Sequence, residues 1–231
     1  MIESILKSDL CLLTLTIGLY CGCSSLYRRT HTVFLHPVLL TFLAMIAFLK
    51  ILGVPYERYR EATEILNFAL GMSVVALGYL LYEQKEQMKG QTAPILASIL
   101  SGCIVGIISV VYIAEYMGAD RTILTSIAPK SVTVPIAVAV AAPLGGEVTV
   151  TSVVVFCVGI FGNMIGFRLL KLFGIRNPKA QGLAMGSAAH GVGTARAIEQ
   201  GAVEGAMSGL AMALMGIATA LLLPLIEKYL Y

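Results

Sequence analysis

Long stretches without a charged residue divide this chain. Six runs free of Asp, Glu, Lys and Arg reach 18 or more residues, namely 10–27, 30–49, 65–82, 90–114, 148–167 and 205–226. A helix needs about 20 mostly apolar residues to cross the hydrocarbon of a bilayer. Backbone polar groups there must be paired within the protein, which favours helices, and the short alternating segments of a barrel are missing from the pattern. The pattern therefore predicts six spanning helices.

Two shorter uncharged runs, 131–146 and 180–195, have a different character. The first contains Pro135, Pro143 and a Gly pair, and the second contains four glycines, at 182, 186, 191 and 193. Proline removes a helical hydrogen bond and glycine weakens a helix interior, so we expect two broken or re-entrant helices. Irregular backbone at membrane depth is tolerated only where it is buried in protein or lines a cavity. The alternative is that both runs are irregular loops between ordinary helices.

A weak internal repeat relates two blocks, 94–149 and 150–205, at a constant sequence offset. The offset places Gly106 on Gly162 and Ser131 on Ser187, and each block reads as a long span, a polar turn and an interrupted segment. If each interrupted segment returns to its own side, the two blocks cross the membrane in opposite directions. Paired interrupted segments of this kind are typical of transporter binding sites. The pattern predicts an all-helical polytopic membrane protein, a single membrane domain over 1–231, with an inverted repeat.

Composition narrows the class of protein further. Hydrophobic residues make up 58% of the 231 residues and charged residues 13%, whereas soluble domains have about 45–50% apolar and about 25% charged residues. This balance excludes an ordinary soluble enzyme and a disordered chain. The net charge is only +3 and the basic residues are scattered, so no nucleic-acid partner is expected.

Lys130 stands at the start of the first interrupted segment, followed by Ser131, Thr133 and Pro135. An ionisable residue at the membrane is costly and usually functional. An ammonium flanked by hydroxyls near a helix N-terminus suits a small anion, because the helix end adds partial positive charge and free N–H donors. The alternative is a lysine that extends to the membrane surface.

The second interrupted segment offers a matching set of candidate ligands: Ser187, His190, Gly191, Gly193, Thr194 and Arg196. His190 could hydrogen-bond a carboxylate, and Arg196 could hold one with two parallel bonds. The glycines would let the backbone approach a ligand. Two alternatives remain open: His190 bonds between helices, or Arg196 pairs with a nearby Glu such as Glu199, at an i,i+3 spacing.

Other chemistry finds little support. The five cysteines lie inside apolar runs and only three histidines are present, so no metal or cofactor site is expected. Neither a Gly-x-Ser-x-Gly elbow nor a His-Glu-x-x-His motif occurs, and we expect no enzymatic activity. Asn163, in the middle of the run 148–167, is expected to bond between helices.

The two interrupted segments carry a family resemblance. Residues 129–137 read Pro-Lys-Ser-Val-Thr-Val-Pro-Ile-Ala, and residues 182–197 read Gly-Leu-Ala-Met-Gly-Ser-Ala-Ala-His-Gly-Val-Gly-Thr-Ala-Arg-Ala. Both segments resemble signatures of the LrgB/CidB family, and the resemblance extends over about residues 30–231.

The resemblance implies a multi-pass protein of the bacterial cytoplasmic membrane. Members are described as antiholin-like proteins linked to control of murein hydrolase activity and cell lysis, and they act with a small LrgA/CidA-type membrane protein. A plastid relative moves glycolate and glycerate, and some bacterial pairs resemble pyruvate facilitators. We therefore expect a carrier or facilitator of small monocarboxylates, with a companion subunit and a homo-oligomeric state. The alternative is an antiholin-like regulator without a substrate of its own.

Overall fold

The computed structural model describes residues 8–30, 37–66 and 90–230, together with 68, 69, 72, 79 and 82. Over these residues the regular structure is helical and contains no strand, as the sequence predicts. The chain divides into two compact units, Met1–Met72 and Ser73–Tyr231, and each is described by itself. The expectation of a single membrane domain stays a prediction.

The first unit contains α2 (Asp9–Thr30), α3 (Pro37–Ile51) and α4 (Tyr56–Ala62). Asp9 in the first turn of α2 complements the positive end of the helix dipole. Arg58 of α4 forms an ion pair with the same carboxylate at 2.6 Å. Leu12, Val54 and Ala62 form a small buried core where the three segments meet.

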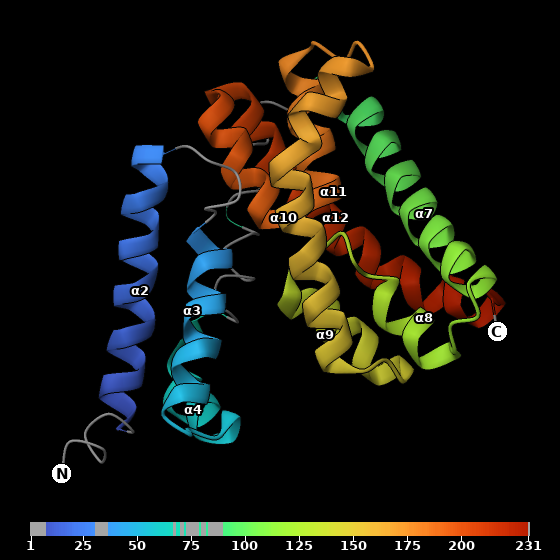
Figure 1. The fold of residues 1–231 in the computed structure, drawn as a ribbon. Coiled ribbons are helices and arrows are strands. Elements are labelled where there is room, and N and C mark those ends of the chain that lie inside the picture. Colours follow the sequence, from blue (N-terminus) through green and yellow to red (C-terminus); the bar gives the residue numbers. More distant parts are fainter. Residues whose placement is uncertain are drawn as a thin grey trace. The chain divides into compact units, whose positions relative to one another are not determined.

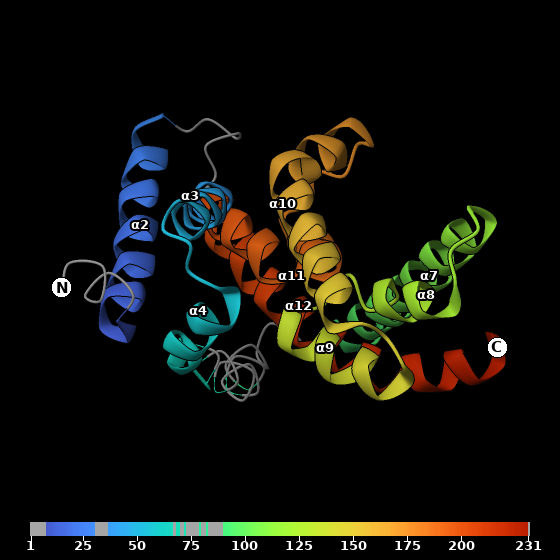
Figure 2. The same ribbon diagram turned by 60° about the horizontal axis from the view of Figure 1, so that its bottom comes forward.

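Residues 90–230 of the second unit contain seven helical elements, which can be followed in Figure 1 and Figure 2. They are α7 (Thr92–Tyr116), α8 (Arg121–Ile127), α9 (Val134–Ala141), the 3-10 helix η2 (Ala142–Leu144), α10 (Val148–Leu172), α11 (Pro178–Gln200) and α12 (Ala202–Leu230). In Figure 1, α7 descends, α10 ascends, and α11 starts at the same end as α7. Helix α12 packs along α11 and supplies much of the core, including Met207, Leu210 and Ala211.

Glycines allow α10, α11 and α12 to pack closely. A Cβ at Gly162 of α10 would overlap the Cβ of Ala189 in α11. Cβ atoms at Gly182 and Gly186 of α11 would overlap main-chain carbonyl oxygens of α12. Small residues at i and i+4 bring helix backbones together in this way, without a hydrophobic driving force from water.

Four of the six predicted spans form candidate membrane-spanning helices in the described part of the chain. Helices α2, α7 and α10, together with Ala202–Lys228 of α12, are long and apolar enough to cross a membrane. They match the runs 10–27, 90–114, 148–167 and 205–226. The run 30–49 overlaps α3, a helix of only 15 residues that ends at Ile51, and most of the run 65–82 lies outside the described residues. The chain is a multi-pass membrane protein.

Both shorter runs are interrupted, but the breaks do not always fall at the glycines. In the first, a turn over residues 128–133 separates α8 from α9, Pro135 lies in the first turn of α9, and η2 ends at Gly145 with φ +89°. In the second, α11 is kinked at Ala189 (φ −129°, ψ 17°) and His190 (φ 41°, ψ −136°). The glycines of this run pack helices together, and the break falls on two residues with side chains.

Helices α7 and α10 correspond at both ends. Helix α7 begins at Thr92 and ends at Tyr116, and the offset between the two sequence blocks carries these positions onto Val148 and Leu172, the bounds of α10. Both helices are followed by a glycine with positive φ, Gly118 at 86° and Gly174 at 75°. A glycine in this conformation is a common way to end a helix, because a side chain there would clash. The offset of the helices therefore equals the offset found in the sequence.

Candidate anion site

A cavity of about 450 Å³ lies in the second unit between α7, α11 and the turn that follows α8, and we call it the Lys130 cavity. Its lining residues are Ser98, Gly102, Val105 and Gly106 of α7, Lys130 and Ser131 of the turn, and Ala180, Leu183, Ala184, Ser187 and Ala188 of α11. Three of the predicted site residues, Lys130, Ser131 and Ser187, are thus brought together. The other lining side chains are small or apolar.

Among the described residues that line this cavity, only Lys130 carries a charge. Its Nζ donates to Ser131 Oγ at 3.1 Å, which leaves two of the three ammonium N–H groups for another acceptor. None of the ion pairs among the described residues includes Lys130. A half-buried ammonium without a counter-charge beside an open cavity is suited to an anion.

The turn that carries Lys130 is held by hydrogen bonds within itself and to the next helix. Lys130 N donates to Ile127 O at 3.1 Å, and Val132 N donates to Pro129 O at 3.3 Å. Ser126 Oγ accepts from the backbone N of Glu147 at 2.7 Å, which ties the end of α8 to the start of α10. These bonds fix the position of the turn relative to α10.

The two remaining cavity serines have already used their hydrogens. Ser98 Oγ donates to Ile95 O at 2.8 Å, and Ser187 Oγ donates to Leu183 O at 2.7 Å, each within its own helix. Both oxygens keep lone pairs that can accept a hydrogen bond. Lys130 and Ser131 therefore form the donor end of the cavity, and a substrate hydroxyl could donate to the other serines.

The start of α7 lies beside the start of α11. Lys179 Nζ donates to Gln91 Oε1 at 3.3 Å. Asn177 caps α11, its Oδ1 accepting from the backbone N of Lys179 at 2.9 Å and of Ala180 at 3.3 Å. The first turns of α7 and α11 are thus held together at the Ser98–Ala180 end of the cavity.

Thr133 and Pro135 begin α9 and lie outside the cavity lining. The Thr133 hydroxyl is buried and has no hydrogen-bond partner in the described part of the chain. Pro135 lacks an N–H and fits the first turn, where that donor would be unpaired. Their direct contact with a substrate stays a prediction.

His190 lies at the kink of α11 and is buried, 4% exposed. Its Nε2 donates to Val155 O of α10 at 2.9 Å. Gly159 makes room for the ring, because a Cβ there would lie 2.6 Å from His190 Cε1. His190 thus joins α11 to α10, which is the interhelical alternative considered above.

The kink predicts an unusual order of stability for substitutions of His190. Glycine tolerates the observed φ of 41° at no steric cost, whereas alanine does not. Both variants lose the bond to Val155 O, so we expect His190→Gly to be more stable than His190→Ala by about 1 kcal/mol. Thermal unfolding of the purified variants in detergent measures the difference. Equal stability of the two would contradict the strained backbone.

Thr194 lines a second, smaller cavity of about 250 Å³ between α11 and α12. Its Oγ1 donates to His190 O at 2.8 Å and lies 2.9 Å from Ser208 Oγ. A Cβ at Gly191 would be in ordinary contact with Met212 Sδ, and a Cβ at Gly193 would lie 2.9 Å from the main-chain oxygen of Met185. These predicted site residues pack α11 in the structure.

Arg196 lies near the end of α11, outside the lining of both cavities, and its Nη1 pairs with Glu199 Oε2 at 2.8 Å. This is the local alternative considered above. Asn163 Nδ2 donates to Val192 O of α11 at 2.9 Å, the expected bond between helices.

Sequence reasoning missed the α7 wall of the Lys130 cavity. Gly102 and Gly106 carry a small-xxx-small spacing, which is more often a packing pattern than a sign of a site. Ser98 carries no recognisable pattern.

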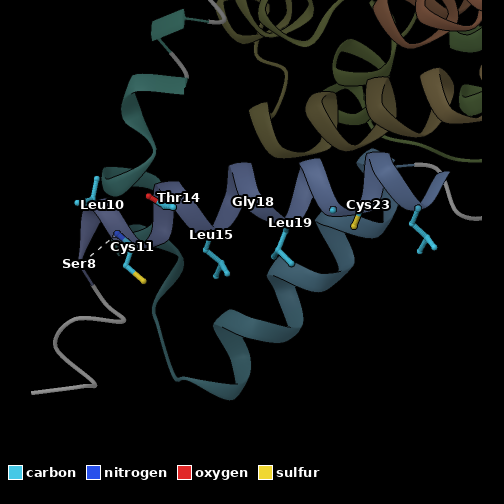
Figure 3. Close-up of a pocket in the computed structure, with 10 residues that line it drawn as sticks. Ser8, Leu10, Cys11, Thr14, Leu15, Gly18, Leu19 and Cys23 are labelled. Carbon is cyan, nitrogen blue, oxygen red and sulfur yellow. Dashed lines mark hydrogen bonds between the residues drawn. The ribbon is translucent and has the colours of Figure 1, made fainter. Parts of the chain in front are cut away.

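A larger groove, of about 750 Å³, runs along one face of α2 and is lined by residues between Ser8 and Leu26. Figure 3 shows Cys11, Leu15 and Leu19 on the same side of the helix. The described residues that line it carry no charge, so it offers nothing to an anion.

Comparisons with known proteins show the family to which the chain belongs. Residues 16–229 match the LrgB-like family. The chain belongs to the LrgB-like family. That match includes every residue of the Lys130 cavity and both interrupted segments of this family member.

Three similar relatives cover nearly the whole chain. The uncharacterized protein YxaC of Bacillus subtilis (strain 168) is 39% identical over 93% of this chain and 94% of its own length. The uncharacterized protein YwbG of the same strain is 32% identical, over 94% and 96%. The holin-like protein CidB of Staphylococcus aureus (strain N315) is 30% identical, over 96% and 97%. No solved structure matches the chain.

Proposed function

We propose that this LrgB-family protein is a carrier or facilitator of small monocarboxylates of the pyruvate, glycolate and glycerate type. The observation that carries the proposal is the cavity beside Lys130, an ammonium with two free donors and no ion pair among the described residues. A carboxylate there would accept from Lys130 Nζ and Ser131 Oγ, and charged hydrogen bonds of this kind are the strong ones. A substrate hydroxyl would donate to Ser187.

The site lies at the centre of an inverted repeat in this proposal. Helix α10 repeats α7 at the offset that relates the two sequence blocks, and the two helices run in opposite senses in Figure 1. The same offset relates Ser131 to Ser187, and both line the cavity. Six spans and two re-entrant helices complete the arrangement. Alternating access would come from movement of one block against the other about the site.

The proposal includes the setting of the protein. It lies in the bacterial cytoplasmic membrane as a homo-oligomer and acts with a small LrgA/CidA-type membrane protein. Arg196 and His190 contribute to transport through the conformation of α11, one through Glu199 and the other through Val155.

A second candidate function is an antiholin-like regulator of murein hydrolase activity and cell lysis. The observation that favours it is the name of the holin-like CidB relatives. A regulator of this kind would act through its association with other subunits. Its activity would therefore not depend on the unpaired charge of Lys130.

Uptake by proteoliposomes separates the two functions. The full chain, alone and with an LrgA/CidA-type subunit, is reconstituted and supplied with labelled pyruvate, glycolate or glycerate. We expect saturable uptake of at least one acid, inhibited by the other two. Uptake no faster than that of empty liposomes, in both preparations, would reject the carrier and favour the regulator.

A further inference from the structure

The walls of the Lys130 cavity are much less polar than its donor end. Beyond Lys130 and Ser131, the lining is mostly glycine, alanine and two aliphatic side chains, Val105 and Leu183. Pockets of about 300–1,000 Å³ hold drug-sized ligands, and this cavity has about 450 Å³. A three-carbon acid would occupy only the donor end.

The glycines of α7 give the cavity a direction. A Cβ at Gly106 would lie 4.0 Å from Ser131 Oγ, so Gly106 faces the donor end. Gly102 is one turn closer to the start of α7, about 6 Å along the helix axis. A Cβ at Gly102 would have no atom within 4 Å. The space beside Gly102 is therefore open, and a side chain there would occupy it without meeting another part of the described chain.

We infer that the cavity accepts monocarboxylates with an apolar chain longer than three carbons, and that Gly102 sets the length of chain that fits. This inference rests on the proposed function for its anchor, the carboxylate at Lys130 and Ser131. The chain then lies along α7 towards Ser98, between Gly102 and the alanines of α11. The glycine, alanine and aliphatic walls offer this chain apolar contacts along α7 and α11.

A series of straight-chain acids tests the inference. Acetate, butyrate and hexanoate compete at pH 7 with labelled pyruvate for uptake into proteoliposomes that contain the full chain. In the wild type, inhibition strengthens with length, by about threefold to fourfold per buried methylene. Inhibition of equal strength by all three acids would overturn the inference and leave the carrier intact.

The matched variants are Gly102→Leu and Gly22→Leu. Both glycines lie in spanning helices, and a Cβ at either has no atom within 4 Å. We expect Gly102→Leu to weaken inhibition by hexanoate at least tenfold and inhibition by acetate less than twofold. Gly22→Leu, on α2, is expected to keep the increase in inhibition from acetate to hexanoate that the wild type shows. Gly102→Ala is expected to weaken inhibition by hexanoate as well, by a smaller factor than Gly102→Leu. An unchanged series in Gly102→Leu, or an equal loss for all three acids, would overturn the role of Gly102.

Thermal stabilisation of the purified protein by the same acids gives a readout independent of transport. A ligand that binds only the folded state raises the unfolding temperature, and the rise increases with its occupancy. Hexanoate is expected to stabilise the wild type more than acetate does, and Gly102→Leu to lose this preference. If the acids stabilise the protein in this order but proteoliposomes show no uptake, the carrier function is rejected and the binding inference is supported. Equal stabilisation by the three acids would reject the inference.

Discussion

Lys130→Met is expected to lower uptake of monocarboxylates by at least tenfold. A hydrogen bond to a charged group contributes about 1.5–3 kcal/mol, and about 1.4 kcal/mol corresponds to a factor of ten in affinity. Lys130 is the one charged residue among the described residues of the cavity lining, so none of these neighbours can replace it. Initial rates of uptake of labelled pyruvate into proteoliposomes measure the loss.

The same substitution is expected to leave the fold intact. Lys130 has no carboxylate partner among the described residues. Its replacement by methionine therefore leaves no buried carboxylate without a counter-charge. We therefore expect an unfolding temperature equal to or above that of the wild type, because a half-buried ammonium is costly without a ligand. Retained stability with lost uptake distinguishes a binding role from a structural one.

Lys130→Arg is the control for the charge at this position. Lys50→Met is the control for the loss of a lysine elsewhere in the chain. Arginine keeps the charge in a different shape, so partial uptake is expected. Lys50 lies in the last turn of α3 in the first unit and is exposed, and its loss is expected to change uptake less than twofold. Uptake by Lys130→Met within twofold of the wild type would remove Lys130 from the site. A lysis assay that responds to none of these variants would favour the regulator.

The spans were predictable because their signal is local. A run of about 20 uncharged residues is a property of consecutive positions, and four of the runs became helices of the required length. The break in α11 was not predictable to the residue. It depends on the bond from His190 to Val155 O and on the space left by Gly159, both on the preceding helix α10. Glycine content indicated a weak helix there, but the contact that places the kink is tertiary.

The candidate site was predictable in part for the same reason. Lys130 and Ser131 stood out as polar residues at the start of an apolar run, and the offset of the repeat pointed to Ser187. Arg196 carried the same signal, but its donors serve Glu199 and a substrate equally well, and sequence spacing cannot decide between them. Gly102 had no side chain to attract notice. Its position in the cavity follows from the way α7 lies beside α11.

Gly186→Ala is expected to produce the largest loss of stability among single-methyl changes in α11. The new Cβ would overlap the main-chain oxygen of Ser208 in α12, and a backbone atom cannot rotate away. Inserting a methyl group into a packed interface costs about 1–3 kcal/mol. Separation of the two helices would also stretch the 2.9 Å contact between Thr194 Oγ1 and Ser208 Oγ. Thermal unfolding in detergent, with size-exclusion chromatography, measures the change.

Gly209→Ala is the matched control, because Gly209 belongs to the same helix pair and a Cβ there has no atom within 4 Å. Alanine is favoured over glycine in a helix interior by up to about 1 kcal/mol. We therefore expect the control to be as stable as the wild type or more stable, a change opposite in sign to that of Gly186→Ala. Gly182→Ala, whose Cβ would overlap the Glu204 carbonyl oxygen, is expected to follow Gly186→Ala. If all three variants were equally stable, the close approach of α11 to α12 would not be what holds the interrupted helix in place.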